Sequence, residues 1–128
     1  MENKKRRILV VDDEPDLTVA CNMLLEYEGF EVDTFNDLLL VLSAFKPNYY
    51  DLALFDIKMP KIDGFSLYNE IKKIDDKIKI CFLTASESYY EEYRKEEFNK
   101  LDKDLFIQKP IENEELIKRI NKVLNNIY

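Results

Sequence analysis

The sequence lacks histidine, contains only two cysteines, and has no long hydrophobic run. Without histidine, the chain lacks the commonest general base and any zinc site built on imidazole ligands. Two cysteines cannot supply a structural zinc set, so metal binding must depend on oxygen ligands, which favours magnesium or calcium. Cys21 and Cys81 fall on a predicted helix face and in a predicted strand, where we expect buried, unpaired thiols.

No apolar run approaches the roughly 20 residues that a membrane span needs, and residues 1–7 lack the apolar segment of a secretory signal. We therefore expect a cytoplasmic protein without a membrane segment. A length of 128 residues suits a single domain over residues 1–128, with a core from about residue 7 to 127 and no output domain. The net charge of −7 argues against contact with a phosphate backbone, so we expect no direct nucleic-acid binding.

Short apolar runs alternate with helical patterns along the whole chain. Residues 52–55 have no polar break, which is typical of a strand buried on both faces of a parallel sheet. Similar runs occur at residues 8–11, 78–83 and 105–108, and residues 30–35 alternate as an edge strand with one wet face would. The order is βα repeated five times, which predicts right-handed crossovers and an α/β fold of three layers, doubly wound, with helices on both faces of the sheet.

The expected helices have recognisable ends and core faces. The first begins with an acid at its cap, Asp13, and ends at Gly29 in a left-handed conformation. Asn36-Asp37 caps the second, the third starts at Gly64, and the weakly amphipathic fourth runs from Tyr89 to about Phe98. The inward residues that we expect are Leu17, Ala20, Cys21, Leu24 and Leu25 in the first helix, Leu38, Val41, Leu42 and Phe45 in the second, Leu67, Tyr68, Ile71 and Ile74 in the third, and Leu116, Ile117, Ile120, Val123, Leu124 and Ile127 in the last.

Polar side chains stand at the ends of four of these strands. Asp12 and Asp13 follow the first strand, Asp56 follows the third, Thr84 the fourth, and Lys109 the fifth. Because the carboxyl ends of parallel strands share one edge, we expect these groups to meet in one cleft. Three carboxylates there require a cation, for which Mg2+ is suited, while Lys109 and Thr84 can bind phosphoryl oxygens. The set predicts phosphoryl transfer with Asp56 as the nucleophile that becomes an acyl phosphate.

Each residue also has a simpler interpretation when taken alone. Asp13 could be only a helix cap, and Asp56 could merely accept bonds from loop amides. Lys109-Pro110 could be an ordinary turn, and Thr84 is a common strand residue. The joint placement at four strand ends therefore carries the inference.

With these residues in view, the chain resembles the receiver domain of two-component response regulators. Val11-Asp12-Asp13 resembles that family's acidic pair, and Asp56-Ile57-Lys58-Met59-Pro60, with Asp63-Gly64 after it, resembles its phosphoacceptor loop. Thr84-Ala85 and Lys109-Pro110 are similar to its switch hydroxyl and its lysine. The resemblance implies a flavodoxin-like fold, a five-stranded parallel sheet of order 2-1-3-4-5 with five helices.

The resemblance also implies how the site works. Asp56 would accept a phosphoryl group from the phosphohistidine of a histidine kinase or phosphotransfer protein, or from a small phosphodonor. Mg2+ would be held by three carboxylates and one backbone carbonyl, those of Asp12, Asp13, Asp56 and Lys58. Lys109 and Thr84 would bind the phosphoryl oxygens. The chain would catalyse only its own phosphorylation and autodephosphorylation, so it would not be an enzyme in the usual sense.

Signalling would pass through a second group of residues. Phe106, three residues before the lysine, would respond together with Thr84 to phosphorylation. The face of helix 4, strand 5 and helix 5 would then control an unknown downstream protein, and it could also form a homodimer. Residues 99–104 depart from the family's Gly/Ala-rich turn at this point.

Two other functions stay open. One is a Mg2+-dependent phosphatase with an aspartyl nucleophile, although such enzymes generally carry a second acid where this chain has Lys58. The other is a degenerate receiver that acts only as a binding module. The intact acidic set argues against this second alternative.

Overall fold

The computed structural model of the chain describes residues 6–56, 64–84, 106–108 and 112–125. Only the backbone is described at Leu38, Asp56, Gly64, Phe65, Thr84, Phe106 and Gln108. The expected fourth helix, from Tyr89 to about Phe98, lies outside the described residues, as do Lys58, Lys109 and Ile127.

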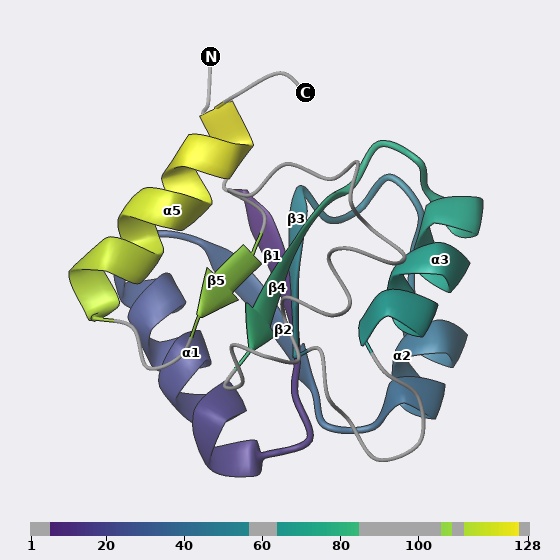
Figure 1. The fold of residues 1–128 in the computed structure, drawn as a ribbon, viewed down its shortest axis with the longest axis horizontal. Coiled ribbons are helices and arrows are strands. Elements are labelled where there is room, and N and C mark those ends of the chain that lie inside the picture. The colour runs from purple at the N-terminus through teal and green to yellow at the C-terminus, as the bar shows by residue number, and fades with distance from the viewer. Residues whose placement is uncertain (1–5, 57–63, 85–105, 109–111, 126–128) are drawn as a thin grey trace.

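Five strands form one parallel sheet in the order β2-β1-β3-β4-β5 (Figure 1). The strands are β1 (Arg7–Val11), β2 (Glu31–Phe35), β3 (Leu52–Asp56), β4 (Lys79–Thr84) and β5 (Phe106–Gln108). The described helices are α1 (Pro15–Tyr27), α2 (Leu38–Ala44), α3 (Gly64–Ile74) and α5 (Asn113–Asn125). The parallel sheet of the expected α/β fold is confirmed, and its strand order agrees with the order that the resemblance implies.

The helices lie in two layers, with α1 and α5 on one face of the sheet and α2 and α3 on the other (Figure 1). Successive side chains of a strand point to opposite faces. Along β1, Ile8 and Val10 therefore join the hydrophobic cluster beneath α1 and α5, whereas Leu9 and Val11 join the cluster beneath α2 and α3. This arrangement explains the unbroken apolar runs, because both faces of the central strands are dry.

The edge strand β2 differs from the expectation. All five of its residues are half-buried, so the predicted alternation between a wet and a dry face is wrong. Val32 packs against the cluster on one face and Phe35 against the cluster on the other, because both α1 and α2 reach this strand. Asp33 is half-buried, and its carboxylate accepts a hydrogen bond of 2.7 Å from the Tyr50 hydroxyl.

The helix ends follow local chemistry with one correction. Asp37 caps α2 as expected, since its Oδ1 accepts the Leu39 N–H at 2.8 Å. Gly29 adopts the expected left-handed conformation, with φ at +97°. At the start of α1, however, the cap residue is Glu14 and no side chain caps the helix, so the assignment of Asp13 as the cap is wrong.

The inward faces are confirmed at most positions and corrected at two. Ala20 is exposed, and Ile74, the last residue of α3, is 46% exposed. The buried stripe of α1 instead includes Thr18, whose hydroxyl is hydrogen-bonded and so tolerates burial. Cys21 and Cys81 are buried and free, as predicted, and burial raises the pKa of the Cys81 thiol to about 12.

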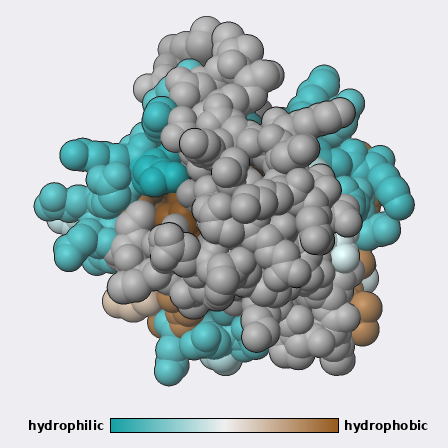
Figure 2. Space-filling model, in the orientation of Figure 1, coloured by the Kyte–Doolittle hydropathy of each residue, from teal (hydrophilic) through white to brown (hydrophobic). Residues whose placement is uncertain are grey.

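In the view of Figure 2, most of the described residues that are visible are hydrophilic, and hydrophobic ones appear at the right and lower-left margins. Met23 and Tyr27 on α1 and Leu39 and Leu40 on α2 are large exposed apolar residues. None of the described helices combines the length with the hydrophobicity of a transmembrane segment.

Candidate functional site

The backbone register brings the predicted site residues to one edge of the sheet. Val11 pairs with Phe55, so Asp12 and Asp56 both follow at the next level. Asp56 in turn pairs with Leu83, the residue before Thr84. The carboxyl ends of β1, β3 and β4 therefore lie side by side, which is where open α/β sheets hold their ligands.

The turn after β1 gathers three carboxylates. Ligand oxygens of Asp12, Asp13 and Glu14 lie within 4.8 Å of one another. Asp12 is 1% exposed, whereas Asp13 and Glu14 face solvent. Neither of the two ion pairs that the structure describes involves Asp13 or Glu14. Three negative charges at this spacing repel one another unless a cation sits among them.

Backbone bonds hold this acidic turn in place. The Asp12 N–H donates to the Phe35 carbonyl at 3.1 Å, which extends the pairing of β1 with β2 beyond the last strand residue. One oxygen of the Asp12 carboxylate accepts the Glu14 N–H at 2.9 Å. This bond takes the place of a side-chain cap at the start of α1, and it leaves Asp13 projecting from the turn as an exposed acid. The alternative interpretation of Asp13 as a helix cap is thereby excluded.

Carboxylate oxygens of this kind and spacing fit a hard divalent cation. Mg2+ takes one or two protein carboxylates and completes its octahedron with water or phosphate oxygens. A buried acid beside two exposed ones can supply these carboxylate ligands. The exposed side remains accessible to the water molecules that complete the octahedron. The donor set is thus compatible with the predicted Mg2+.

Of the remaining predicted residues, some are described only by their backbone and others lie outside the described residues. Thr84 pairs with Gln108, and Phe106 pairs with Phe82, so both predicted switch positions lie on adjacent strands. Lys109 lies outside the described residues, as does Lys58. The roles of all these side chains stay predictions.

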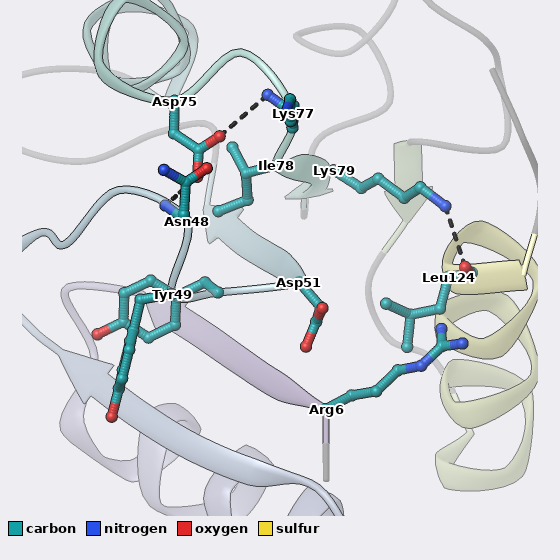
Figure 3. A pocket seen from close by; sticks show the side chains of 10 residues that line it. Arg6, Asn48, Tyr49, Asp51, Asp75, Lys77, Ile78, Lys79 and Leu124 are labelled. Atoms are coloured by element: carbon teal, nitrogen blue, oxygen red, sulfur yellow. Dashed lines mark hydrogen bonds between the residues drawn. The ribbon is translucent and has the colours of Figure 1, made fainter. Parts of the chain in front are cut away.

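A pocket of about 410 Å³ lies at the opposite edge, at the amino ends of the strands (Figure 3). Its acids are bound to backbone groups: the Asp75 carboxylate accepts the N–H groups of Asn48 at 2.8 Å and Lys77 at 3.0 Å. The Lys79 ammonium donates to the Leu124 carbonyl at 3.0 Å, near the end of α5. These bonds close turns and a helix end, so this pocket is a structural feature.

Two residues near the acidic turn were not predicted from the sequence as part of the site. Glu14 directly follows Asp12 and Asp13, so the third consecutive acid was the available signal. Asn36, expected only as part of a helix cap, donates instead to the Asp12 carbonyl oxygen at 2.7 Å. No local pattern connects Asn36 with Asp12, which lies 24 residues earlier in the sequence.

The response regulator receiver domain model matches residues 8–121, nearly the whole described fold. The chain belongs to the response regulator receiver domain family. It is therefore a phosphorelay signalling module of the two-component type.

Relatives and solved structures agree with this family. The transcriptional regulatory protein RprY of Bacteroides fragilis is 36% identical over 98% of the chain and 52% of the relative. The CpxR homolog of Haemophilus influenzae is 36% identical over 92% of the chain and 50% of the relative. The chain thus spans about half the length of the curated relatives it matches.

Two solved structures share the receiver fold. The non-phosphorylated HemR receiver domain from Leptospira biflexa has a TM-score of 0.82 at 28% identity, covering 97% of this chain and 98% of that one. The response regulator TrrA from Thermotoga maritima, in complex with Mg2+ and BeF, has a TM-score of 0.74 at 31% identity, covering 92% and 98%.

Proposed function

We propose that this receiver domain is switched by phosphorylation of Asp56, with Mg2+ bound at the acidic turn and a histidine kinase or phosphotransfer protein as donor. The observation that carries the proposal is the backbone register, which sets the end of β3 beside the buried Asp12. Support also comes from the TrrA complex, whose Mg2+ and BeF are the ligands such a site would take.

In the proposed reaction, a carboxylate oxygen of Asp56 attacks the phosphorus atom of the donor phosphohistidine. The P–N bond breaks as the new P–O bond forms, and the electron pair leaves with the imidazole. Bound Mg2+ would supply charge neutralisation for the phosphoryl oxygens. Asp12 and Asp13 would hold the ion together with Asp56 and the Lys58 carbonyl. Lys109 and Thr84 would bind phosphoryl oxygens.

The signal would leave through strand β5 and its flanking helices. Thr84 would move toward the phosphoryl group, and Phe106 on the adjacent strand would take up the vacated space, which makes a two-state element biased by one charge change. The face of helix 4, β5 and α5 would then bind a downstream protein or a second copy of the chain.

We also propose that residues 1–128 form one receiver domain with no nucleic-acid contact of its own. Several relatives are transcriptional regulators about twice as long, so any DNA binding would belong to other parts of such proteins. The net charge of −7 supports this division. The alternative of an aspartyl phosphatase gains no support from the family match.

The test is a mass measurement after incubation with acetyl phosphate and Mg2+. We expect wild type to gain the mass of one phosphoryl group and Asp56→Asn to gain none. Glu70→Gln, on the exposed surface of α3, is the matched control that removes a carboxylate elsewhere. Equal incorporation by wild type and Asp56→Asn would overturn the proposal.

A further inference from the structure

One side chain joins the acidic turn to two other segments. The Asn36 amide, just after β2, donates to the Asp12 carbonyl oxygen at 2.7 Å and to the Thr18 hydroxyl oxygen at 3.0 Å. The Thr18 hydroxyl, which is buried, donates to the Pro15 carbonyl oxygen at 2.9 Å. These bonds connect the end of β2, the turn after β1 and the first turn of α1.

The chemistry of the groups sets the direction of each bond. A carbonyl oxygen can only accept, so the Asn36 nitrogen must face Asp12, and the Thr18 proton must face Pro15. The hydroxyl oxygen of Thr18 then accepts the second N–H of Asn36. An apolar side chain at position 36 could make neither bond, and an aspartate would set acceptor against acceptor.

We propose that Asn36 is a positioning residue for Mg2+, because it anchors the peptide group that joins Asp12 to Asp13. This inference rests on the proposed function, since it assumes that the acidic turn receives the ion. The Asp12 carbonyl and the Asp13 N–H belong to one rigid plane. Holding that oxygen therefore restricts the rotation that would change how the two carboxylates face each other.

The anchor acts on the geometry of the site more than on its charge. Mg2+ requires nearly ideal octahedral coordination at short distances, whereas Ca2+ accepts irregular and larger coordination shells. Loss of the anchor is therefore expected to weaken Mg2+ more than Ca2+. A residue with only a general structural role would not change this selectivity.

The test measures both dissociation constants from the amide chemical shifts of Asp13 and Glu14, titrated separately with MgCl2 and CaCl2. Removal of partners that orient metal ligands typically costs 10- to 100-fold in affinity. We expect Asn36→Leu, which keeps the size of the side chain, to weaken Mg2+ binding about tenfold and to lower the preference for Mg2+ over Ca2+.

A pair of variants at Thr18 keeps the test decisive even if Asn36→Leu fails to fold. Thr18→Val removes the hydroxyl that holds the Asn36 amide in place. We expect it to weaken Mg2+ binding and to lower the preference for Mg2+ over Ca2+, both by a smaller factor than Asn36→Leu does. Thr18→Ser keeps the hydroxyl and is expected to behave as wild type. Asn69→Leu, an equivalent change at an exposed position of α3, should leave both constants unchanged.

The outcomes separate the inference from the function beneath it. If wild type binds Mg2+ and the Asn36 and Thr18 variants bind it equally well, the positioning role is wrong and the proposed metal site stands. If both ions weaken by the same factor, Asn36 stabilises the turn without tuning its geometry, and the inference also fails. If wild type itself does not bind Mg2+, the metal role and the inference fall together.

Discussion

The two edges of the sheet treat their acids in opposite ways. At the amino edge, the buried Asp75 accepts two backbone N–H groups, and Asp51 accepts the Arg7 N–H at 2.8 Å. At the carboxyl edge, Asp13 and Glu14 stand exposed beside the buried Asp12, with their oxygens within 4.8 Å. Carboxylates that bind backbone groups stabilise the fold, whereas crowded exposed carboxylates are costly without a ligand.

The contrast between these acids indicates which edge can bind a ligand. A carboxylate with both oxygens bound to backbone N–H groups, as in Asp75, has little left for a ligand. The amino edge holds a pocket of about 410 Å³, but its polar groups close turns and a helix end (Figure 3). The carboxyl edge keeps acids that face solvent, and this is the edge that the family match implicates.

Removal of Asp75 should have the largest effect on stability. Asp75→Ala leaves the N–H groups of Asn48 and Lys77 without their partner, and we expect a loss of about 3 kcal/mol in the free energy of unfolding. Asp76→Ala, at the exposed neighbouring position, should change it by less than about 0.5 kcal/mol. Urea unfolding of both variants checks this, and similar losses in the two would show that the amino edge is not closed by Asp75.

Alkaline pH should destabilise the hydrophobic core in which Cys81 is buried. The pKa of the buried Cys81 thiol is raised to about 12, so its contribution to stability is complete below the ordinary thiol value near 8.5. It is lost as the pH rises from there toward 12, because only the unfolded state releases the proton. Between pH 8.5 and 10 we expect wild type to lose about 1.5 kcal/mol more than Cys81→Ala.

Unfolding free energies under reducing conditions at pH 7, 8.5 and 10 provide the measurement. The slope with pH is compared rather than the absolute stability, because the substitution itself removes packing atoms. Parallel slopes in the two proteins would mean that the thiol ionises as readily inside the fold as outside it.

Mg2+ should stabilise wild type through the carboxyl edge alone. At ten times the dissociation constant, a ligand that binds only the folded state adds about 1.4 kcal/mol. We expect Asp13→Asn to abolish most of the rise in Tm, whereas Asp51→Asn at the amino edge keeps it. The prediction fails if Mg2+ does not raise the Tm of wild type, or if Asp13→Asn and Asp51→Asn lose the rise in Tm equally.

The smallest effect is expected for a tyrosine at the amino edge. The Tyr50 hydroxyl donates to an oxygen of Asp33 at 2.7 Å, so Tyr50→Phe should cost about 1 kcal/mol. The described residues give the Tyr49 hydroxyl no hydrogen bond, and Tyr49→Phe should change stability by less than about 0.5 kcal/mol. Chemical denaturation of the two single variants compares them directly, and the prediction fails if they are equally stable.

Local patterns were sufficient for the parts of the fold that depend on one segment. The run Ile8-Leu9-Val10-Val11 predicts a strand buried on both faces because its four side chains alternate between two dry layers. Once strands are parallel, Asp12 and Asp56 must share an edge, so their backbone proximity also follows from the sequence.

Other features depend on specific hydrogen bonds rather than on a periodic pattern, and they were not predicted. Burial of Thr18 in place of Ala20 is tolerated because Asn36 supplies a hydrogen bond from a distant segment. The Asp12 carboxylate takes the Glu14 N–H, which displaces the expected cap at Asp13. Neither interaction leaves a periodic signal. The first depends on how distant segments meet in the fold, and the second depends on the local conformation of the turn after β1.

The most direct test records backbone amide shifts before and after phosphorylation with acetyl phosphate and Mg2+. We expect the largest changes at Asp12–Glu14, at Asp56 and from Thr84 through Leu105. Changes should be far smaller along α1 from Leu17 to its end, and at the amino edge, from Asn48 to Asp51 and from Asp75 to Lys79. Shifts of equal size at both edges, or none beyond Asp56 and its immediate neighbours, would contradict a phosphorylation switch at the carboxyl edge of the sheet.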